Sequence, residues 1–408
     1  MRREVCAICE SDRLEPILDL GDSPLADTFP LSPAHEVRYR LDLLLCLHCG
    51  LVQLGEIVDD GLLFGKDYAF FSGSSPSLVE HYLDYARAML KGFPDECRRG
   101  VVEIASNDGT LLKHFADAGC PVLGVDPAVP PAEDAAKRGI NTRIRAFTLA
   151  EAEAIVASRH GGHLGGKPGL ILANNVLAHV IDPLDVMRGI EALLGPEGVA
   201  VIEVQYFPDL LFGNEWDHVY HEHRTYLSLT SVAALAARAN LSVVDVYNSP
   251  TQGGSIRVFL RHQGEQSQRV AQMLAREAGM GLRAPQTYAN WQCRVDFTRD
   301  RLGEILWDFK ASGKTVAGYG ASAKSSTLLN YCKIGTGDIA YVEDVTPYKI
   351  GCVTPGTHIP IRAPHAQEKP DAYLLLVWNY LGGVMRRERK FLANGGQFIV
   401  PIPHPVIL

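Results

Sequence analysis

The stretch "GVVEIASNDGTLLKHFADAG" at residues 100–119 decides the fold. It begins with a short apolar run that ends at Glu103, passes through a polar turn, and then places apolar residues at helical spacing. A second apolar run, "CPVLGVDPA" at residues 120–128, ends at Asp126. A strand, a turn, a helix and a second strand in this order predict an open α/β sheet whose carboxyl edge binds a ligand.

The polar turn after Glu103 indicates which ligand that edge binds. Asp126 stands at the spacing from which a carboxylate accepts the ribose hydroxyls of an adenosine. The turn lacks G-x-G-x-x-G, so a dinucleotide pyrophosphate is disfavoured, whereas acidic and neutral polar groups suit the amino group and sulfonium of S-adenosylmethionine. An ordinary α/β strand with surface acids is the alternative. The expected cofactor-binding residues are Glu103, Ala105, Asn107, Asp108, Asp126 and Asn174.

Strand and helix patterns continue to the end of the chain. Apolar runs at 169–180, 198–205, 241–250 and 254–262 extend the first sheet, a charged helical stretch occupies about 264–312, and a second alternation begins at 314. We therefore predict an α/β protein of three parts: an N-terminal zinc-binding domain at 1–62, a class I methyltransferase Rossmann-like domain at 63–263, and a helical connector with a C-terminal Rossmann-like domain at 264–408.

Four of the nine cysteines form two C-x2-C pairs, and the other five stand alone. Two such pairs in a reducing compartment are typical of four thiolates around a tetrahedral zinc ion, which leaves no open position for water. Buried apolar cysteines or a single redox pair are the alternatives. The sequence thus predicts a structural zinc site formed by Cys6, Cys9, Cys46 and Cys49.

Composition excludes several classes of protein. The 408 residues are 47% hydrophobic and 21% charged, and no apolar run has the length of roughly 20 residues that a membrane span needs. The N-terminal sequence "MRREVCAIC" lacks the apolar core of a secretory signal, so we expect a cytoplasmic protein. A net charge of -8 without a dense basic run argues against a nucleic-acid partner.

The second alternation carries its own glycine-containing turn, "VAGYGASAKSSTLLN" at 316–330. Backbone N–H groups and a lysine where a helix begins favour an anion such as a nucleotide diphosphate. Small residues that simply pack the helix on its strand are the alternative. Glu343 and Asp344, after the next strand, keep open an NAD(P)-dependent enzyme. The expected substrate-binding residues in this turn are Gly320, Ser322, Lys324 and Ser325.

The stretch "NEWDHVYHEHRTYLS" at 214–228 holds three histidines, two glutamates and two tyrosines. This density of titratable groups indicates proton transfer, because histidine and tyrosine can serve as general bases or acids. A polar loop without catalysis is the alternative. A metal held by His218, His221 and His223 is possible by ligand type, but we discount it.

In this order, "CAIC…CLHC", "VVEIASNDGTLL", "LANNVLAHV", "YHEH" and "VAGYGASAKSSTLLNYC" make the chain resemble the deoxysugar C-methyltransferases of antibiotic biosynthesis, including the sugar 3-C-methyltransferase of the tetronitrose pathway. The resemblance covers essentially the whole chain. It implies methyl transfer from S-adenosylmethionine to carbon 3, next to the 4-keto group, of a TDP-linked deoxysugar, through an enolate. Family members usually have glycine where this chain has Ala105, which would be awkward if that residue needs a positive φ.

The resemblance also implies roles for individual residues. His223 or Tyr220 would take the α-proton, Glu222 would orient or tune the imidazole, and His179 would donate to the carbonyl oxygen. An imidazole with a pKa near ~6.5 is available as a base at neutral pH, whereas a tyrosine near ~10 needs help. Tyr68 and Phe71 lie in a stretch that would cover the sugar, or in the core.

Several interpretations of the sequence stay open. An NAD(P)-dependent nucleotide-sugar reductase or epimerase and a non-catalytic nucleotide-binding module are the rival functions. The sequence also leaves open which nucleotide sugar is used, which carbon is methylated and with what stereochemistry, and the oligomeric state, a monomer included.

Overall fold

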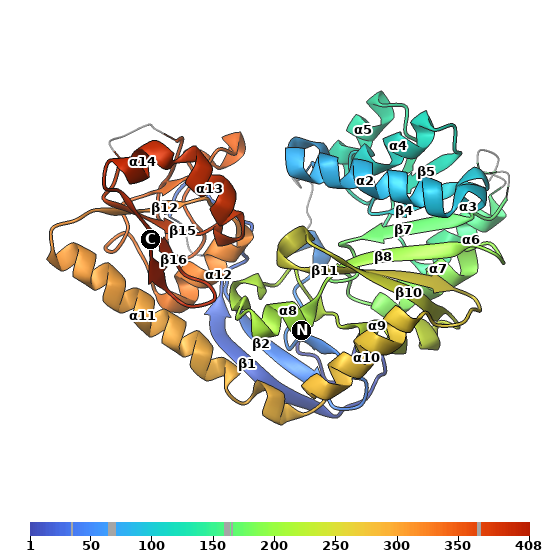
Figure 1. The fold of residues 1–408 in the computed structure, drawn as a ribbon, viewed down its shortest axis with the longest axis horizontal. Helices are drawn as coiled ribbons and strands as arrows, with labels where there is room; N and C mark the ends of the chain where they lie inside the picture. The colour runs from blue at the N-terminus through green and yellow to red at the C-terminus, as the bar shows by residue number, and fades with distance from the viewer. Residues whose placement is uncertain (34–35, 64–70, 159–163, 165, 365–368) are drawn as a thin grey trace.

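The computed structural model describes residues 1–33, 36–63, 71–158, 164, 166–364 and 369–408. These residues form three sheets. The methyltransferase sheet and the C-terminal sheet form two large lobes, and Figure 1 shows β1 and β2 in blue below and between them. The described helices include none that is both long and apolar enough to cross a membrane.

The N-terminal sheet is antiparallel and has the order β1-β2-β3-β9. Its first three strands come from the zinc-binding domain, whereas β9 comes from the methyltransferase region. Val52 pairs with Tyr226, and Gln53 pairs with Thr225. The strand bounds are β1 Leu14–Ser23, β2 Tyr39–Cys46, β3 Val52–Leu54 and β9 Thr225–Tyr226.

The methyltransferase sheet has seven strands in the order β6-β5-β4-β7-β8-β11-β10, the strand order of class I methyltransferases. The strands from β6 to β8 are parallel, and β11 is antiparallel to both of its neighbours. Parallel strands bring their carboxyl ends to one edge, so the turns after β4, β5 and β7 lie together. The bounds are β4 Val101–Ile104, β5 Val122–Val125, β6 Thr142–Arg143, β7 Leu170–Asn174, β8 Val199–Gln205, β10 Ser242–Ser249 and β11 Ser255–Arg261.

Helices cover the methyltransferase sheet because their apolar positions recur at helical spacing. In Figure 1, α2 crosses above the sheet, and α7 and α9 lie below it. The helices of this region are α1 Asp60–Leu63, α2 Pro76–Gly92, α3 Pro94–Arg98, α4 Thr110–Asp117, α5 Val129–Lys137, α6 Leu149–Ala157, α7 Pro183–Leu193, α8 Phe207–Phe212 and α9 Leu229–Arg238. Its 3-10 turns are Ser72–Ser74, Trp216–His218 and Thr251–Gly253.

Two helices, α10 Gln268–Met280 and α11 Trp291–Ala311, connect the lobes, and α11 runs along the lower left of Figure 1. The C-terminal sheet has the order β14-β13-β12-β15-β16-β17, in which only β17 is antiparallel to its neighbour. Its strands are β12 Val316–Tyr319, β13 Val342–Glu343, β14 Ile361–Arg362, β15 Ala372–Leu375, β16 Gln397–Val400 and β17 Val406–Ile407. Its helices are α12 Ala323–Cys332, α13 Leu381–Arg387 and α14 Arg389–Ala393, with 3-10 turns at Pro347–Lys349 and Trp378–Tyr380 and another, Pro285–Tyr288, before α11.

The hydrophobic cores run across the three sequence segments. One cluster joins Cys6 and Leu51 of the zinc-binding domain to Ile171 of the methyltransferase sheet. A second joins Leu43 of β2 to Trp291 of α11 and to the C-terminal sheet. The N-terminal sheet therefore packs against both lobes, which fixes the loop between β8 and β9 at their junction. The domain boundaries at residues 62 and 263 stay predictions.

Candidate active site and zinc centre

The four cysteines predicted as zinc ligands lie together. Their sulfur atoms are all within 4.8 Å of one another, and the Cys6–Cys49 and Cys9–Cys46 sulfurs are 3.5 Å apart. None of the four forms a disulfide. A tetrahedron of sulfurs about 2.3 Å from a zinc ion has edges of about 3.8 Å, so the cluster has the right size and donor type. These residues would hold a structural zinc ion, with no position left for a substrate.

The predicted cofactor residues meet at the carboxyl edge of β4, β5 and β7. Ala105 has φ 56° and Asn107 has φ 49°, so the chain turns sharply after β4. The Asn107 backbone N–H donates to Asp126 Oδ2 at 2.8 Å, and the Ala128 N–H donates to Oδ1 at 2.8 Å. Ala105 therefore does adopt the positive φ that favours glycine, and the turn accommodates its Cβ.

Some buried polar atoms at this edge have no hydrogen-bond partner among the described residues. They are one carboxylate oxygen of Glu103 and the Ser106 hydroxyl, and the Asn174 amide interacts with Glu103 beside them. Burial raises the pKa of Glu103 well above its usual value, with Asp126 and Asp108 adding to the effect. Because buried polar groups are nearly always hydrogen-bonded, these atoms indicate a site for a polar ligand, and they suit S-adenosylmethionine.

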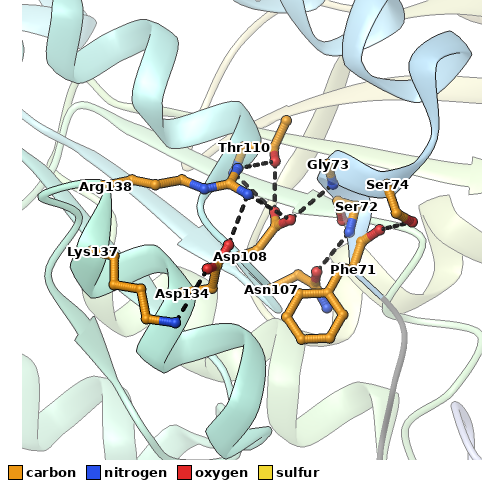
Figure 2. A network of polar contacts seen from close by, with 10 residues as sticks. All are labelled: Phe71, Ser72, Gly73, Ser74, Asn107, Asp108, Thr110, Asp134, Lys137 and Arg138. Atoms are coloured by element: carbon orange, nitrogen blue, oxygen red, sulfur yellow. Dashed lines mark hydrogen bonds and ion pairs between the residues drawn. The ribbon is translucent and has the colours of Figure 1, made fainter.

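Asp108 belongs to the same turn, but its carboxylate is bound by the protein (Figure 2). It accepts hydrogen bonds from the Gly73 N–H at 2.8 Å and from the Thr110 hydroxyl at 2.6 Å, and Arg138 lies at 3.4 Å. The neighbouring Asn107 Oδ1 accepts the Ser72 N–H at 2.8 Å. The cofactor turn thus holds the segment that precedes α2.

The predicted catalytic residues come from two loops. His179 follows β7, and Tyr220, Glu222 and His223 lie between β8 and β9. The His179 and His223 rings are 5.0 Å apart between centroids, and the Tyr220 and His223 rings 4.1 Å. The structure therefore brings both histidines and Tyr220 into one half-buried cluster.

Hydrogen bonds define the tautomer of His223. Its Nδ1 lies 3.0 Å from the His218 carbonyl oxygen, which can only accept, so Nδ1 carries the hydrogen. Burial lowers the pKa of His223 well below its usual value, so the ring is neutral and Nε2 is an acceptor. The Tyr220 hydroxyl, whose pKa is raised by burial, therefore donates to Nε2 at 2.8 Å.

His179 is fixed in the same way. Its Nδ1 donates to the Glu222 carbonyl oxygen at 2.8 Å, and burial lowers the pKa of the ring. In the neutral ring Nε2 is then an acceptor, so the donor role that the sequence suggested for His179 requires a protonated ring.

The Glu222 carboxylate is not placed as expected. Among the described residues it makes no hydrogen bond to His223, which is oriented by the His218 carbonyl, and its Oε2 has no partner. Burial raises the pKa of Glu222 to about 7. The orienting role suggested by the sequence thus falls to the backbone of His218.

His218 and Asp217 are buried, and the sequence indicated no catalytic role for either. Gln205 Nε2 lies 2.7 Å from His218 Nδ1, and Trp378 Nε1 donates to Asp217 Oδ2 at 2.7 Å. Burial raises the pKa of Asp217 to about 6. The indole of Trp378 lies on a turn more than 150 residues away in the chain, and no spacing in the sequence indicated this contact.

In the predicted anion-binding turn of the C-terminal domain, most polar groups already form hydrogen bonds within the protein. The Ser322 hydroxyl accepts the Ser325 N–H at 3.3 Å, and Gly320 has φ 88° with Val377 so close that a Cβ would lie 2.5 Å from Cγ1. Lys324 is buried and donates to Asn379 Oδ1 at 2.6 Å. Burial is the main cause of the lowered pKa values of His218 and His223, and the charge of Lys324 lowers them further, so Lys324 borders the 214–228 loop.

Tyr68 and Phe71 are the two aromatic residues that the sequence placed over the sugar or in the core. Tyr68 lies outside the described residues. Phe71 precedes the Ser72–Ser74 turn that the cofactor loop holds, and it is half-buried. A groove of about 800 Å³ lies elsewhere, between β1, α11 and α12, and its lining includes Arg40, Arg299 and Asn330 but none of the predicted site residues.

Three family models match successive parts of the chain. They are described as "Putative zinc binding domain" at residues 6–64, "Methyltransferase domain" at 79–246 and "C-methyltransferase C-terminal domain" at 250–403. These matches agree with the cysteine cluster and with the class I strand order. The fold is therefore a zinc-binding domain, a class I methyltransferase domain whose cofactor is S-adenosylmethionine, and a C-terminal Rossmann-like domain.

Among characterised relatives, the C-methyltransferase NovU of Streptomyces niveus is 36% identical over 99% of this chain and 96% of its own length. A ubiquinone biosynthesis O-methyltransferase of Actinobacillus pleuropneumoniae serotype 5b (strain L20) is 31% identical over 29% of this chain and 49% of its own. A methyltransferase solved with the Trm112 activator of Haloferax volcanii is 14% identical, with a TM-score of 0.37 over 47% of this chain and 95% of that one, too distant to add to the fold. The near-complete match to NovU, together with the C-methyltransferase domain, shows that this chain belongs to the C-methyltransferase family and is an enzyme that transfers methyl groups.

Proposed function

We propose that the enzyme methylates carbon 3, next to the 4-keto group, of a TDP-linked deoxysugar in natural-product biosynthesis. The observation that carries this proposal is the hydrogen bond from the Tyr220 hydroxyl to His223 Nε2, in a ring whose Nδ1 is held by the His218 carbonyl. Transfer to carbon requires a base, whereas transfer to an oxygen or nitrogen does not need an enolising one. A tyrosine backed by a neutral imidazole supplies such a base.

The chemistry follows from this pair. A C–H bond beside a ketone can lose its proton because the electron pair moves into the carbonyl as an enolate. The Tyr220 oxygen accepts that proton while its own proton passes to His223 Nε2, so the high pKa of Tyr220 does not require a free phenolate. S-adenosylmethionine, when bound, supplies the electrophilic methyl group, and its sulfur keeps the electron pair of the bond that breaks. The enolate carbon forms the new C–C bond.

The surrounding residues assist in different ways. His179 would face the carbonyl oxygen and donate to it once protonated. Lys324 contributes positive charge beside the catalytic loop, which favours an enolate over a neutral ketone. The α12 turn with Gly320, Ser322 and Ser325 would lie near the nucleotide, and Phe71 near the sugar. A cytoplasmic location fits such a substrate and stays part of the proposal.

The reductase alternative is weakened by the acids that it would need. Glu343 Oε1 accepts the Tyr373 hydroxyl at 2.8 Å, and the Asp344 carboxylate accepts the N–H groups of Ala321 at 2.6 Å and Thr346 at 2.7 Å. The Glu343 carboxylate is therefore engaged by a side chain within the protein, whereas Asp344 has two backbone N–H contacts just as Asp126 does, so it is Glu343 that weakens this alternative.

The test is to incubate the protein with S-adenosylmethionine and a panel of TDP-4-keto sugars, and to follow the sugar by mass. A gain of one CH2 on carbon is expected. In deuterium oxide without cofactor, the accepted sugar should exchange its α-proton. Methylation without any such exchange, with the new methyl on oxygen or nitrogen, would contradict the proposal, as would oxidation of NAD(P)H by the same sugars.

A further inference from the structure

Arg224 is a buried cation directly after His223. Its side chain is 1% exposed, and its guanidinium spans three groups. Nη1 donates to the His179 carbonyl oxygen at 2.6 Å, and Nη2 donates to the Val58 carbonyl oxygen at 2.8 Å and pairs with Asp60 at 2.6 Å. One side chain thus connects the loop after β7 with the end of the zinc-binding domain.

The backbone of Arg224 makes the same connection. Its N–H donates to the Ala178 carbonyl oxygen at 2.6 Å, and its carbonyl oxygen accepts the Leu54 N–H at 3.0 Å. The next residue, Thr225, donates through its hydroxyl to the Leu177 carbonyl oxygen at 3.1 Å. The turn that carries His179 and the loop that carries His223 are therefore both attached where β9 begins.

The zinc centre lies a short path from this point. Gln53 of β3 pairs with Thr225 of β9 and is completely buried. Its Oε1 accepts the N–H of Ala7, which stands between Cys6 and Cys9, at 2.9 Å. The first cysteine knuckle is thus held by the same strand that positions β9.

Arg224 also sets the charge around His179. Burial is the main cause that lowers the pKa of His179, and the positive charge of Arg224 lowers it further. Among the described residues, His223 and, through its carbonyl oxygen, Glu222 also contact this ring. Loss of the cation should therefore raise the pKa of His179 toward its ordinary value.

We propose that Arg224 is a positioning residue for methyl transfer, which ties the loops of His179 and His223 to each other and to the zinc-binding sheet. The guanidinium suits this role because its planar fork reaches two carbonyls and a carboxylate at once, which a lysine ammonium cannot do in the same geometry. The role in the reaction rests on the proposed function of the two histidines, whereas the positioning of their loops does not.

The test uses the full-length, zinc-loaded protein and the variants Arg224→Gln and Arg224→Lys. For Arg224→Gln we expect kcat to fall about 100-fold, as small displacements of catalytic groups do, with the Kd of S-adenosylhomocysteine and the zinc content unchanged. For Arg224→Lys we expect a fall of about tenfold. The pKa of His179, followed by NMR of labelled histidines, should rise in the glutamine variant and stay near the wild-type value in the lysine variant.

Arg238→Gln is the matched control. Arg238 also links the methyltransferase region to the zinc-binding domain, through an ion pair with Glu10 at 2.8 Å, but it touches neither histidine. It should keep wild-type kcat and His179 titration. Wild-type kcat in both Arg224 variants, or an unchanged His179 titration in Arg224→Gln, would overturn the proposal.

If Arg224→Gln does not fold, Arg224→Lys decides, because wild-type kcat in that variant rejects the proposal. If the wild-type protein methylates no keto sugar, the proposed function fails, while the NMR titration still tests the positioning of His179.

Discussion

The two Rossmann-like sheets end in similar polar edges, but they use their polar groups differently. At the methyltransferase edge, Glu103 and Ser106 keep buried atoms without a hydrogen-bond partner in the described chain. At the C-terminal edge, Glu343 binds Tyr373, Asp344 binds two backbone N–H groups, and Lys324 binds Asn379. Among the described residues from 316 onward, every buried side-chain nitrogen and oxygen has a partner.

This difference distinguishes a sheet edge that binds a ligand from an edge whose polar groups form their hydrogen bonds within the protein. Buried polar groups without partners are costly, so they persist where a ligand completes them. Under the proposed function, the first sheet carries the cofactor site, and the second contributes mainly shape and the charge of Lys324. The 214–228 loop lies between them and shares the first sheet's pattern, because Asp217 and Glu222 also keep buried atoms without hydrogen-bond partners among the described residues.

The largest expected effect comes from His223→Asn. The variant loses the acceptor for the Tyr220 hydroxyl, so turnover should fall by about 10²- to 10⁴-fold, while the Kd of S-adenosylhomocysteine stays unchanged. Single-turnover mass analysis and calorimetry measure the two quantities. His358→Asn, in the C-terminal lobe, is the control: it loses a contact with Glu36 and should keep its turnover. A wild-type rate in His223→Asn would remove His223 from the base.

Glu222→Gln should change how stability depends on pH. The folded pKa of Glu222, about 7, lies above the unfolded value of about 4.3, so the carboxyl favours the fold below pH ~4.3 and this contribution is lost as pH rises through about 7. Glutamine stays neutral. The variant should therefore equal the wild type near pH 4 and exceed it by about 3 kcal/mol at pH 8, by urea unfolding.

Glu343→Gln is the corresponding substitution at the C-terminal sheet. The amide oxygen can still accept the Tyr373 hydroxyl, so stability should change by less than ~1 kcal/mol. If Glu222→Gln were no more stable than the wild type at pH 8, the hydrogen bonds that the Glu222 carboxyl accepts from the backbone N–H groups of Glu222 and Asp27 would outweigh the cost of its burial.

Asn174→Ala and Asp344→Ala test the two edges directly. Asn174→Ala removes an amide that interacts with Glu103, so it should weaken S-adenosylmethionine binding about tenfold and cost no more than about 1 kcal/mol of stability. Asp344→Ala removes the acceptor of two backbone N–H groups and should cost about 1–2 kcal/mol without changing the Kd of the cofactor. Calorimetry measures the Kd of S-adenosylmethionine for both variants, and urea unfolding measures their stability. The reverse result would mean that the second sheet binds the cofactor.

The smallest effect concerns the backbone. Ala105→Gly relieves a positive φ of 56° and should stabilise the protein by up to about 1 kcal/mol. Lys333→Gly, at a φ of 55° where α12 ends, should give a similar gain. Only the first variant should change the Kd of S-adenosylmethionine, because only Ala105 lies in the cofactor turn. A loss of stability in Ala105→Gly would mean that its Cβ contributes packing that outweighs the strain. Thermal unfolding measures both gains.

Sequence patterns predicted much of the fold and part of the site. The apolar run that ends at Glu103 and the C-x2-C pairs are local signals, and the structure confirms the sheet and the cysteine cluster. The orienting role of Glu222 could not be judged locally, because in a tight loop a side chain and its own carbonyl can face different neighbours: the carbonyl binds His179, and the carboxylate is buried elsewhere. Arg224 was missed because an isolated arginine in a charged stretch is usually solvent-exposed.

By itself, the sequence determined which segments form strands and helices, where four thiolates could meet, and that the 214–228 loop is rich in groups that move protons. These features depend on residues close together in the chain. Only the tertiary structure decided that β9 joins the zinc-binding sheet, that Trp378 binds Asp217, and which nitrogen of His223 carries hydrogen. These outcomes depend on which distant groups share a buried space, because burial and long-range hydrogen bonds, rather than local pattern, determine protonation.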